Sequence, residues 1–152
     1  MYGLLEPTGV TYWVPWSVCV AGDMGLVAWF AFWLYGRSAP ARELLAQGRR
    51  EHPGAEVWVV ELDAEWNPIP EPAMTTLVAD RGRLLINGFL EVPGNDVVSV
   101  ATVLVTVRWH ALSIVVGDAT WTVLVRGGRW GTTGDRVITQ EAAQRIDAAL
   151  LS

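Results

Sequence analysis

Residues 16–35 read WSVCVAGDMGLVAWFAFWLY and contain one charged residue, Asp23. A helix needs about twenty consecutive, mostly apolar residues to cross the hydrocarbon core of a membrane, and residues 14–36 provide that length. The segment therefore predicts a single transmembrane helix over residues 14–36. The alternative is a soluble homo-oligomer that buries residues 14–36 between its subunits.

The residues that flank this segment predict its orientation. Tryptophan favours the two membrane–water interfaces, and four tryptophans lie toward the ends of the segment as candidate interface anchors: Trp13, Trp16, Trp29 and Trp33. Residues 1–15 contain no arginine, whereas residues 37–50 contain four. Because positively charged flanks stay in the cytoplasm, we expect a single-pass protein of the cell membrane. Its N-terminus (1–13) would be extracytoplasmic and its C-terminal domain cytoplasmic.

Asp23 opposes membrane insertion. A central Asp costs about 2.5–3.5 kcal/mol on the insertion scale, while Leu, Phe and Val contribute about −0.3 to −0.6 kcal/mol each. Residues 16–35 contain seven of these apolar residues. Their summed favourable insertion free energy nearly cancels the cost of inserting Asp23. Either a partner for Asp23 or a shifted span with Asp23 near the interface would favour insertion. Ala21 and Gly25 form a small-xxx-small pair that lets helices approach closely, so Asp23, Ala21 and Gly25 are candidate contacts with a partner helix.

Composition argues against several classes of function. The net charge is −5, and the eleven basic residues are all arginines without a basic run, so the electrostatic footprint of a nucleic-acid-binding protein is absent. One cysteine and two histidines provide no cluster with metal-ligand spacing. Glu61, Asp63 and Glu65 share one face of a predicted strand, where we expect a solvated face rather than a cation site. We therefore expect that the protein is not an enzyme, and that it binds no metal, cofactor or small-molecule substrate.

The remaining chain predicts a linker followed by a β-rich domain. Residues 37–54 form the linker, in which APARELLAQGRRE (39–51) predicts a short polar helix that lies on the membrane surface or leads to the domain. The stretch EVWVVELDAEW (56–66) alternates with period two, which is typical of a half-buried strand. Its apolar positions share one face: Trp58, Val60, Leu62, Ala64 and Trp66.

Turn residues divide the rest of the domain. Three short signals predict hairpin turns: Asp-Arg-Gly (80–82), Asn-Gly (87–88, a two-residue loop) and Gly-Asp (117–118, type II′). The run VVSVATVLVTVRW (97–109) predicts one long strand. Thr139, with Glu141 in the following turn, predicts the start of an amphipathic C-terminal helix. We therefore expect about seven strands in a meander, followed by one helix.

This order of elements, with LVADRGRLLI (77–86) and GNDVVSV (94–100), resembles bacterial pleckstrin-homology-like domains. The resemblance covers residues 55–152. It implies a mainly β (α+β) fold, in which an N-terminal transmembrane helix precedes a seven-stranded PH-like barrel or sandwich capped by a C-terminal helix. It also implies protein or lipid binding rather than catalysis, and bacterial relatives are often tethered by N-terminal membrane helices. The acidic, proline-rich loop NPIPEPA (67–73) departs from the basic loop of phosphoinositide-binding members.

One connection near the C-terminus combines arginine and tryptophan, which are enriched at binding hot spots: Arg126, Arg129, Trp130 and Arg136. This set predicts a contact with a partner or the membrane surface, the alternative being that Trp130 packs back onto the core. We expect a membrane-tethered, non-enzymatic accessory or scaffolding protein. It would dock a cytoplasmic PH-like domain onto a larger membrane complex through an integral membrane protein partner. A membrane module that binds anionic lipid is the alternative.

Overall fold

The computed structural model describes residues 9–127 and 132–152, without the side chains of residues 9–17, 34 and 35. The chain divides into two compact units between Arg37 and Ser38. The helix α1 (Gly9–Glu51) runs through this boundary. The second unit also contains the sheet and the C-terminal helix, and we call it the domain (38–152).

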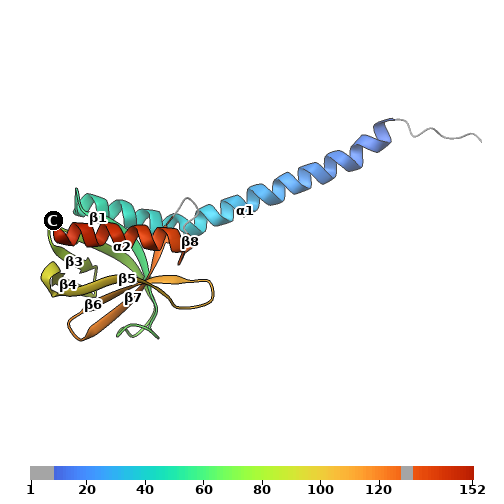
Figure 1. Cartoon of the computed structure of the whole chain (residues 1–152). Coiled ribbons are helices and arrows are strands. Elements are labelled where there is room, and N and C mark those ends of the chain that lie inside the picture. The colour runs from blue at the N-terminus through green and yellow to red at the C-terminus, as the bar shows by residue number, and fades with distance from the viewer. Residues whose placement is uncertain (1–8, 128–131) are drawn as a thin grey trace, which may run out of the picture. The chain divides into compact units, whose positions relative to one another are not determined.

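The domain contains one antiparallel sheet and the helix α2 (Figure 1). Its elements follow in chain order: β1 (Glu56–Leu62), β2 (Ala73–Asp80), β3 (Arg83–Ile86), β4 (Leu90–Pro93), a 3-10 turn (Gly94–Asp96), β5 (Val97–Leu104), β6 (His110–Val116), β7 (Ala119–Gly127), β8 (Thr132–Thr133) and α2 (Arg136–Leu151). The strand order is β4-β3-β2-β1-β7-β6-β5, and β8 pairs with β7. An apolar N-terminal helix, a mainly β domain and a C-terminal helix are thus confirmed, with the two-residue β8 in addition to the seven expected strands.

The main core lies between one face of the sheet and α2. Trp58, Val60 and Leu62 point toward this core, as their alternation predicted, and Val60 and Leu62 are fully buried. α2 contributes Ala142 and Ile146, both inaccessible to solvent. Hydrophobic burial on one stripe of a helix and one face of a sheet is the usual basis of such two-layer packing.

The last turns of α1 are part of the domain. We expected a separate short helix after residue 36, but α1 continues without a break to Glu51. Pro40 lies inside this helix, where it has no N–H to donate to the carbonyl four residues earlier. A Cβ on Gly48 would lie 2.8 Å from Val57 Cγ1 and 3.3 Å from Thr76 Cγ2. At Gly48, segment 38–51 therefore lies close to β1 and β2.

Two of the three predicted hairpin turns have the expected form. Arg81 and Gly82 adopt φ values of 48° and 72° between β2 and β3, as a two-residue turn of the I′ class requires. Gly117 has a φ of 57° and connects β6 to β7 together with Asp118, in agreement with a type II′ turn. The third turn differs, because Ile86 pairs with Leu90 and leaves a three-residue loop rather than the predicted Asn-Gly pair.

The run 97–109 is not one strand, because β5 ends at Leu104. The following residues turn the chain back: the Val105 N–H donates to the Trp109 carbonyl at 3.0 Å. The Thr106 hydroxyl oxygen accepts from the Trp109 N–H at 3.2 Å. A hydroxyl that bonds local backbone competes with strand pairing, which explains why this β-branched run folds into a hairpin.

α2 begins earlier than predicted. Asp135, not Thr139, is the N-cap, and its carboxylate accepts from the Ile138 N–H at 3.1 Å. The Thr139 hydroxyl instead donates to the Asp135 carbonyl at 2.6 Å and is fully buried. Asp is among the best N-cap residues because its side chain satisfies an unpaired N–H of the first turn.

Candidate functional site

The surface of α1 between residues 18 and 33 is unusual for a water-exposed helix. Its large apolar side chains are exposed: Val18, Val20, Met24, Leu26, Val27, Trp29, Phe30, Phe32 and Trp33. In the described part of the chain, α1 is the one helix long and apolar enough to cross a membrane, with a mean hydropathy of 1.6 in its most apolar stretch. A helix that is apolar on all sides is stable when buried in a large core or in a membrane.

The predicted helix-contact residues all lie on this exposed surface. Asp23, Ala21 and Gly25 are exposed, and no atom of the described chain would meet a Cβ on Gly25 within 4 Å. Asp23 makes no ion pair with the residues that the structure describes. The carboxylate and the small-residue pair are therefore accessible to a second molecule.

Aromatic and cationic side chains meet at the end of this surface. The Arg37 guanidinium carbon lies 5.1 Å from the centre of the Trp33 ring, and Phe30 stacks on Trp33 with a centroid distance of 6.0 Å. A cation over an indole face is attracted by the ring quadrupole. Trp29 is also exposed here, whereas the side chains of Trp13 and Trp16 lie outside the described residues.

Two members of the predicted arginine–tryptophan set, Arg126 and Arg136, lie in the described part of the chain. The Arg126 side chain is 15% exposed, and its Nη1 donates to Glu61 Oε1 at 3.0 Å. Arg136 is exposed at the first position of α2. Arg129 and Trp130 lie outside the described residues. Arg126 therefore stabilises the β1–β7 surface, and Arg136 is the described member of the set with an exposed side chain.

The hairpin between β5 and β6 adds an exposed surface that the predicted single strand over residues 97–109 does not contain. Val107 is 96% exposed and Trp109 is 47% exposed at its tip, with Arg108 between them. Trp109 also packs against Gly134, since a Cβ on that glycine would lie 3.2 Å from Trp109 Cβ. We call Val107, Arg108 and Trp109, together with Arg136, which follows Gly134 by two residues in the chain, the β5–β6 tip surface. A single strand over residues 97–109, as predicted, would have no turn at this position.

The carboxylates of the β1 region form no described metal site. Glu61 pairs with Arg126, and Asp63 accepts a hydrogen bond from the Glu65 N–H at 2.9 Å. Among residues 9–127 and 132–152, no group of three His, Cys, Asp or Glu side chains is arranged to hold a metal ion. The Glu61 and Asp63 carboxylates therefore have structural contacts of their own.

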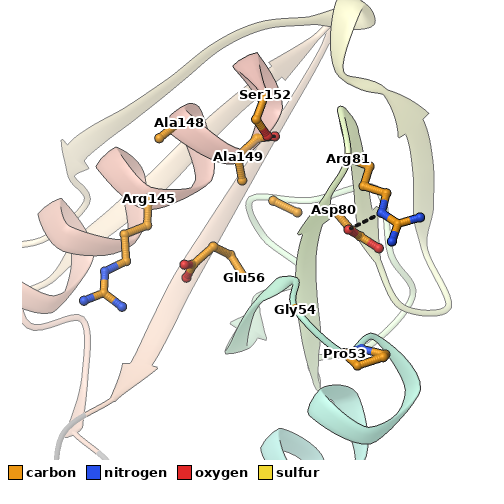
Figure 2. Close-up of a pocket in the computed structure, with 10 residues that line it drawn as sticks. Pro53, Gly54, Glu56, Asp80, Arg81, Arg145, Ala148, Ala149 and Ser152 are labelled. Atoms are coloured by element: carbon orange, nitrogen blue, oxygen red, sulfur yellow. Dashed lines mark hydrogen bonds and ion pairs between the residues drawn. The ribbon is translucent and has the colours of Figure 1, made fainter.

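Two cavities lie between α2 and the start of β1. The first, about 440 Å³, is shown in Figure 2, with Glu56 and Arg145 on one side and the Asp80–Arg81 turn on the other. The second, about 370 Å³, we call the Trp58 groove. Four elements line it, with Leu45 and Arg49 from α1, Glu56 and Trp58 from β1, Arg126 from β7 and Arg145 from α2. No local sequence signal could join residues so far apart in the chain.

No protein-family model, curated protein or solved structure matches the chain.

Proposed function

We propose that the chain is a membrane-tethered, non-enzymatic accessory or scaffolding protein. Residues 14–36 of α1 cross the cell membrane, and the domain docks onto a larger membrane complex from the cytoplasmic side. The observation that carries this proposal is the exposed apolar surface of α1 between residues 18 and 33. Contiguous apolar surface of this kind marks a membrane or protein contact.

Helix length supports the membrane as the environment of this surface. At about 1.5 Å per residue, residues 14–36 extend about 34 Å, enough for a hydrocarbon core of about 30 Å. Arg37 over Trp33 suits the end of a span, because aromatic rings favour the interface and a long cationic side chain can reach the headgroups. The four arginines between residues 37 and 50 favour a cytoplasmic domain.

The domain supports a binding role. In its sheet β1 lies between β2 and β7, and α2 packs on the core. The sequence of this domain resembles PH-like domains. That resemblance implies a binding module, although fold analogy alone assigns no function. The β5–β6 tip surface offers an exposed Trp and two arginines, the residue types that dominate binding hot spots. We propose that this surface contacts the partner complex.

Asp23 supports a partner within the membrane. Ionisable residues inside a span are costly and almost always face another helix or a polar cavity. Asp23 is exposed on α1, so an integral membrane partner with a polar or basic group would stabilise it.

The experiment is co-purification of the tagged chain in mild detergent at native expression. We expect a larger assembly that dissociates when Asp23 is replaced by Leu and stays intact in the control Met24→Leu, which changes an exposed apolar residue of the same turn. Asp23→Leu also makes insertion more favourable, so loss of the assembly cannot come from loss of membrane anchoring. Recovery of a lone monomer, or an assembly unaffected by Asp23→Leu, would contradict the partner proposal.

A further inference from the structure

The strand β5 forms one end of the sheet. It pairs with β6 on one side and, within the described part of the chain, has no strand neighbour on the other. Six of its eight residues are apolar, yet none of the eight is buried, and Val98 and Leu104 are 70% and 62% exposed. The backbone N–H and C=O groups on the free side of such a strand are a template for a further strand.

The opposite end of the sheet is protected against such pairing, whereas β5 is not. Natural edge strands are usually short, charged, bulged, interrupted by proline or covered. The other edge strand, β4, has four residues and ends with Pro93, and its Glu91 forms an ion pair with Arg83 of β3 at 3.0 Å. β5 has eight residues without charge or proline. The shift in its pairing with β6 lies before Ser99, so the segment Ser99–Leu104 is a regular, uncharged edge.

The middle of this edge is accessible in the folded domain. Ala101 is exposed, and it lies level with Thr122 of β7, two strands away across β6. Residues 128–131, outside the described part of the chain, join Gly127 to Thr132, which lie opposite each other in β7 and β8. Gly127 is about 16 Å further along β7 than Thr122, and four residues that return to the neighbouring strand reach about 7 Å. Residues 128–131 therefore cannot cover Ala101.

A second copy of the same strand is a suitable occupant of this edge. Two identical strands pair antiparallel about a twofold axis, which makes the interface self-complementary. Each chain carries a net charge of −5, which opposes association, but residues 97–107 contain no charged residue. Two β5 edges therefore meet without like charges opposite each other, which would be destabilising. Pairing along Ser99–Leu104 would form about six backbone hydrogen bonds between the copies.

We propose that two copies of the chain form a dimer through antiparallel pairing of their β5 strands. The twofold axis passes at Ala101 or Thr102, in the middle of the regular segment, and the two sheets become one continuous sheet. Such an axis keeps the two core faces on the same side, so one residue lies directly opposite its own copy. This dimer does not depend on the membrane role proposed above, because all of its contacts belong to the domain.

The first test is disulfide trapping of the full chain in mild detergent. Cys19 is exposed and is the one cysteine of the chain, so Cys19→Ser provides the background. Residues 99–103 are then replaced by cysteine one at a time. We expect one position to give most of the disulfide-linked dimer, because the copies of each neighbouring residue are about 7 Å further apart along the strands. Ser113→Cys is the control: Ser113 pairs with Ala101 on β6, and its two copies would be about 14 Å apart, too far for a disulfide.

The second test is the protein mass of the particle, measured by light scattering after size exclusion at several protein concentrations. We expect a dimer that Ala101→Lys weakens about tenfold or more, because lysine on an edge strand opposes pairing with a further strand. Ser113→Lys places the same charge on the same face of an internal strand and should retain the dimer. Equal free energies of unfolding of the two lysine variants verify that both fold.

Two results would overturn the proposal. The first is a chain that is monomeric at every concentration, as expected if the β5 edge is free or binds a segment of another protein. The second is a dimer that gives no peak in disulfide trapping or is unaffected by Ala101→Lys, because its contact then lies elsewhere, for example in α1.

Discussion

Replacing Gly48 with Ala tests whether the end of α1 is an integral part of the domain. In a helix without neighbours, Gly→Ala stabilises by about 1 kcal/mol through helix propensity. Gly48, however, lies against β1 and β2: an added Cβ would be 2.8 Å from Val57 Cγ1. Carbon atoms in favourable contact are about 3.5–4.0 Å apart, so the helix or the strand would have to move by about 0.7 Å or more.

The expected result is a net loss of stability. Overpacking a well-packed contact costs about 1–3 kcal/mol, and subtracting the propensity gain of about 1 kcal/mol leaves a loss of up to about 2 kcal/mol. Gly48→Val adds further methyl groups at the same contact and should lower the free energy of unfolding more than Gly48→Ala does. The sign of the Gly48→Ala effect therefore distinguishes a packed helix from a free one.

The assay is guanidinium unfolding of the full chain in mild detergent, followed by tryptophan fluorescence. Ala46→Gly is the matched control, because Ala46 is exposed in the same turns of α1 and should lose about 1 kcal/mol through propensity alone. If Gly48→Ala raises the free energy of unfolding by the amount that Ala46→Gly lowers it, segment 38–51 does not pack on the sheet as described, and the reasoning is refuted.

Two further predictions concern α2 and use the same unfolding assay. Asp135→Ala removes the N-cap bond to the Ile138 N–H and should lower the free energy of unfolding by about 0.5–2 kcal/mol. Asp135→Asn can still accept this hydrogen bond and should keep most of the stability that Asp135→Ala loses. Equal losses in the two variants would exclude the cap. Ile146→Ala empties a fully buried position and should cost about 2–5 kcal/mol, compared with less than about 0.5 kcal/mol for Gln144→Ala at an exposed position. A small loss at Ile146 would mean that α2 does not close the core.

Local sequence patterns predicted correctly those features of the fold that depend on local backbone geometry. Trp58, Val60 and Leu62 could be assigned to the core face because period-two alternation follows directly from strand geometry. Gly117-Asp118 could be assigned to a turn because few residues accept a positive φ. The cap at Asp135 also has a local signal, since Asp is a better N-cap than Thr, although Thr139 with Glu141 predicts a later start of the helix.

Other features depend on contacts between distant segments and could not be found in this way. The turn after Leu104 interrupts an apolar, β-branched run, and Trp109 is held there partly by packing on Gly134. Gly48 lies in the predicted polar linker helix, and it is the position where α1 approaches the sheet. The Trp58 groove combines side chains from α1, β1, β7 and α2, which only the folded chain brings together.

The central claim, that α1 anchors the chain in a membrane, is tested most directly by alkaline carbonate extraction of membranes from cells that express a C-terminally tagged chain. We predict that the wild-type chain stays in the membrane pellet. Val27→Asp, which adds a second carboxylate one turn from Asp23, should be released, because each central Asp costs about 2.5–3.5 kcal/mol. Release of the wild-type chain into the supernatant would contradict the membrane span and would favour a soluble oligomer that buries the exposed apolar surface of α1.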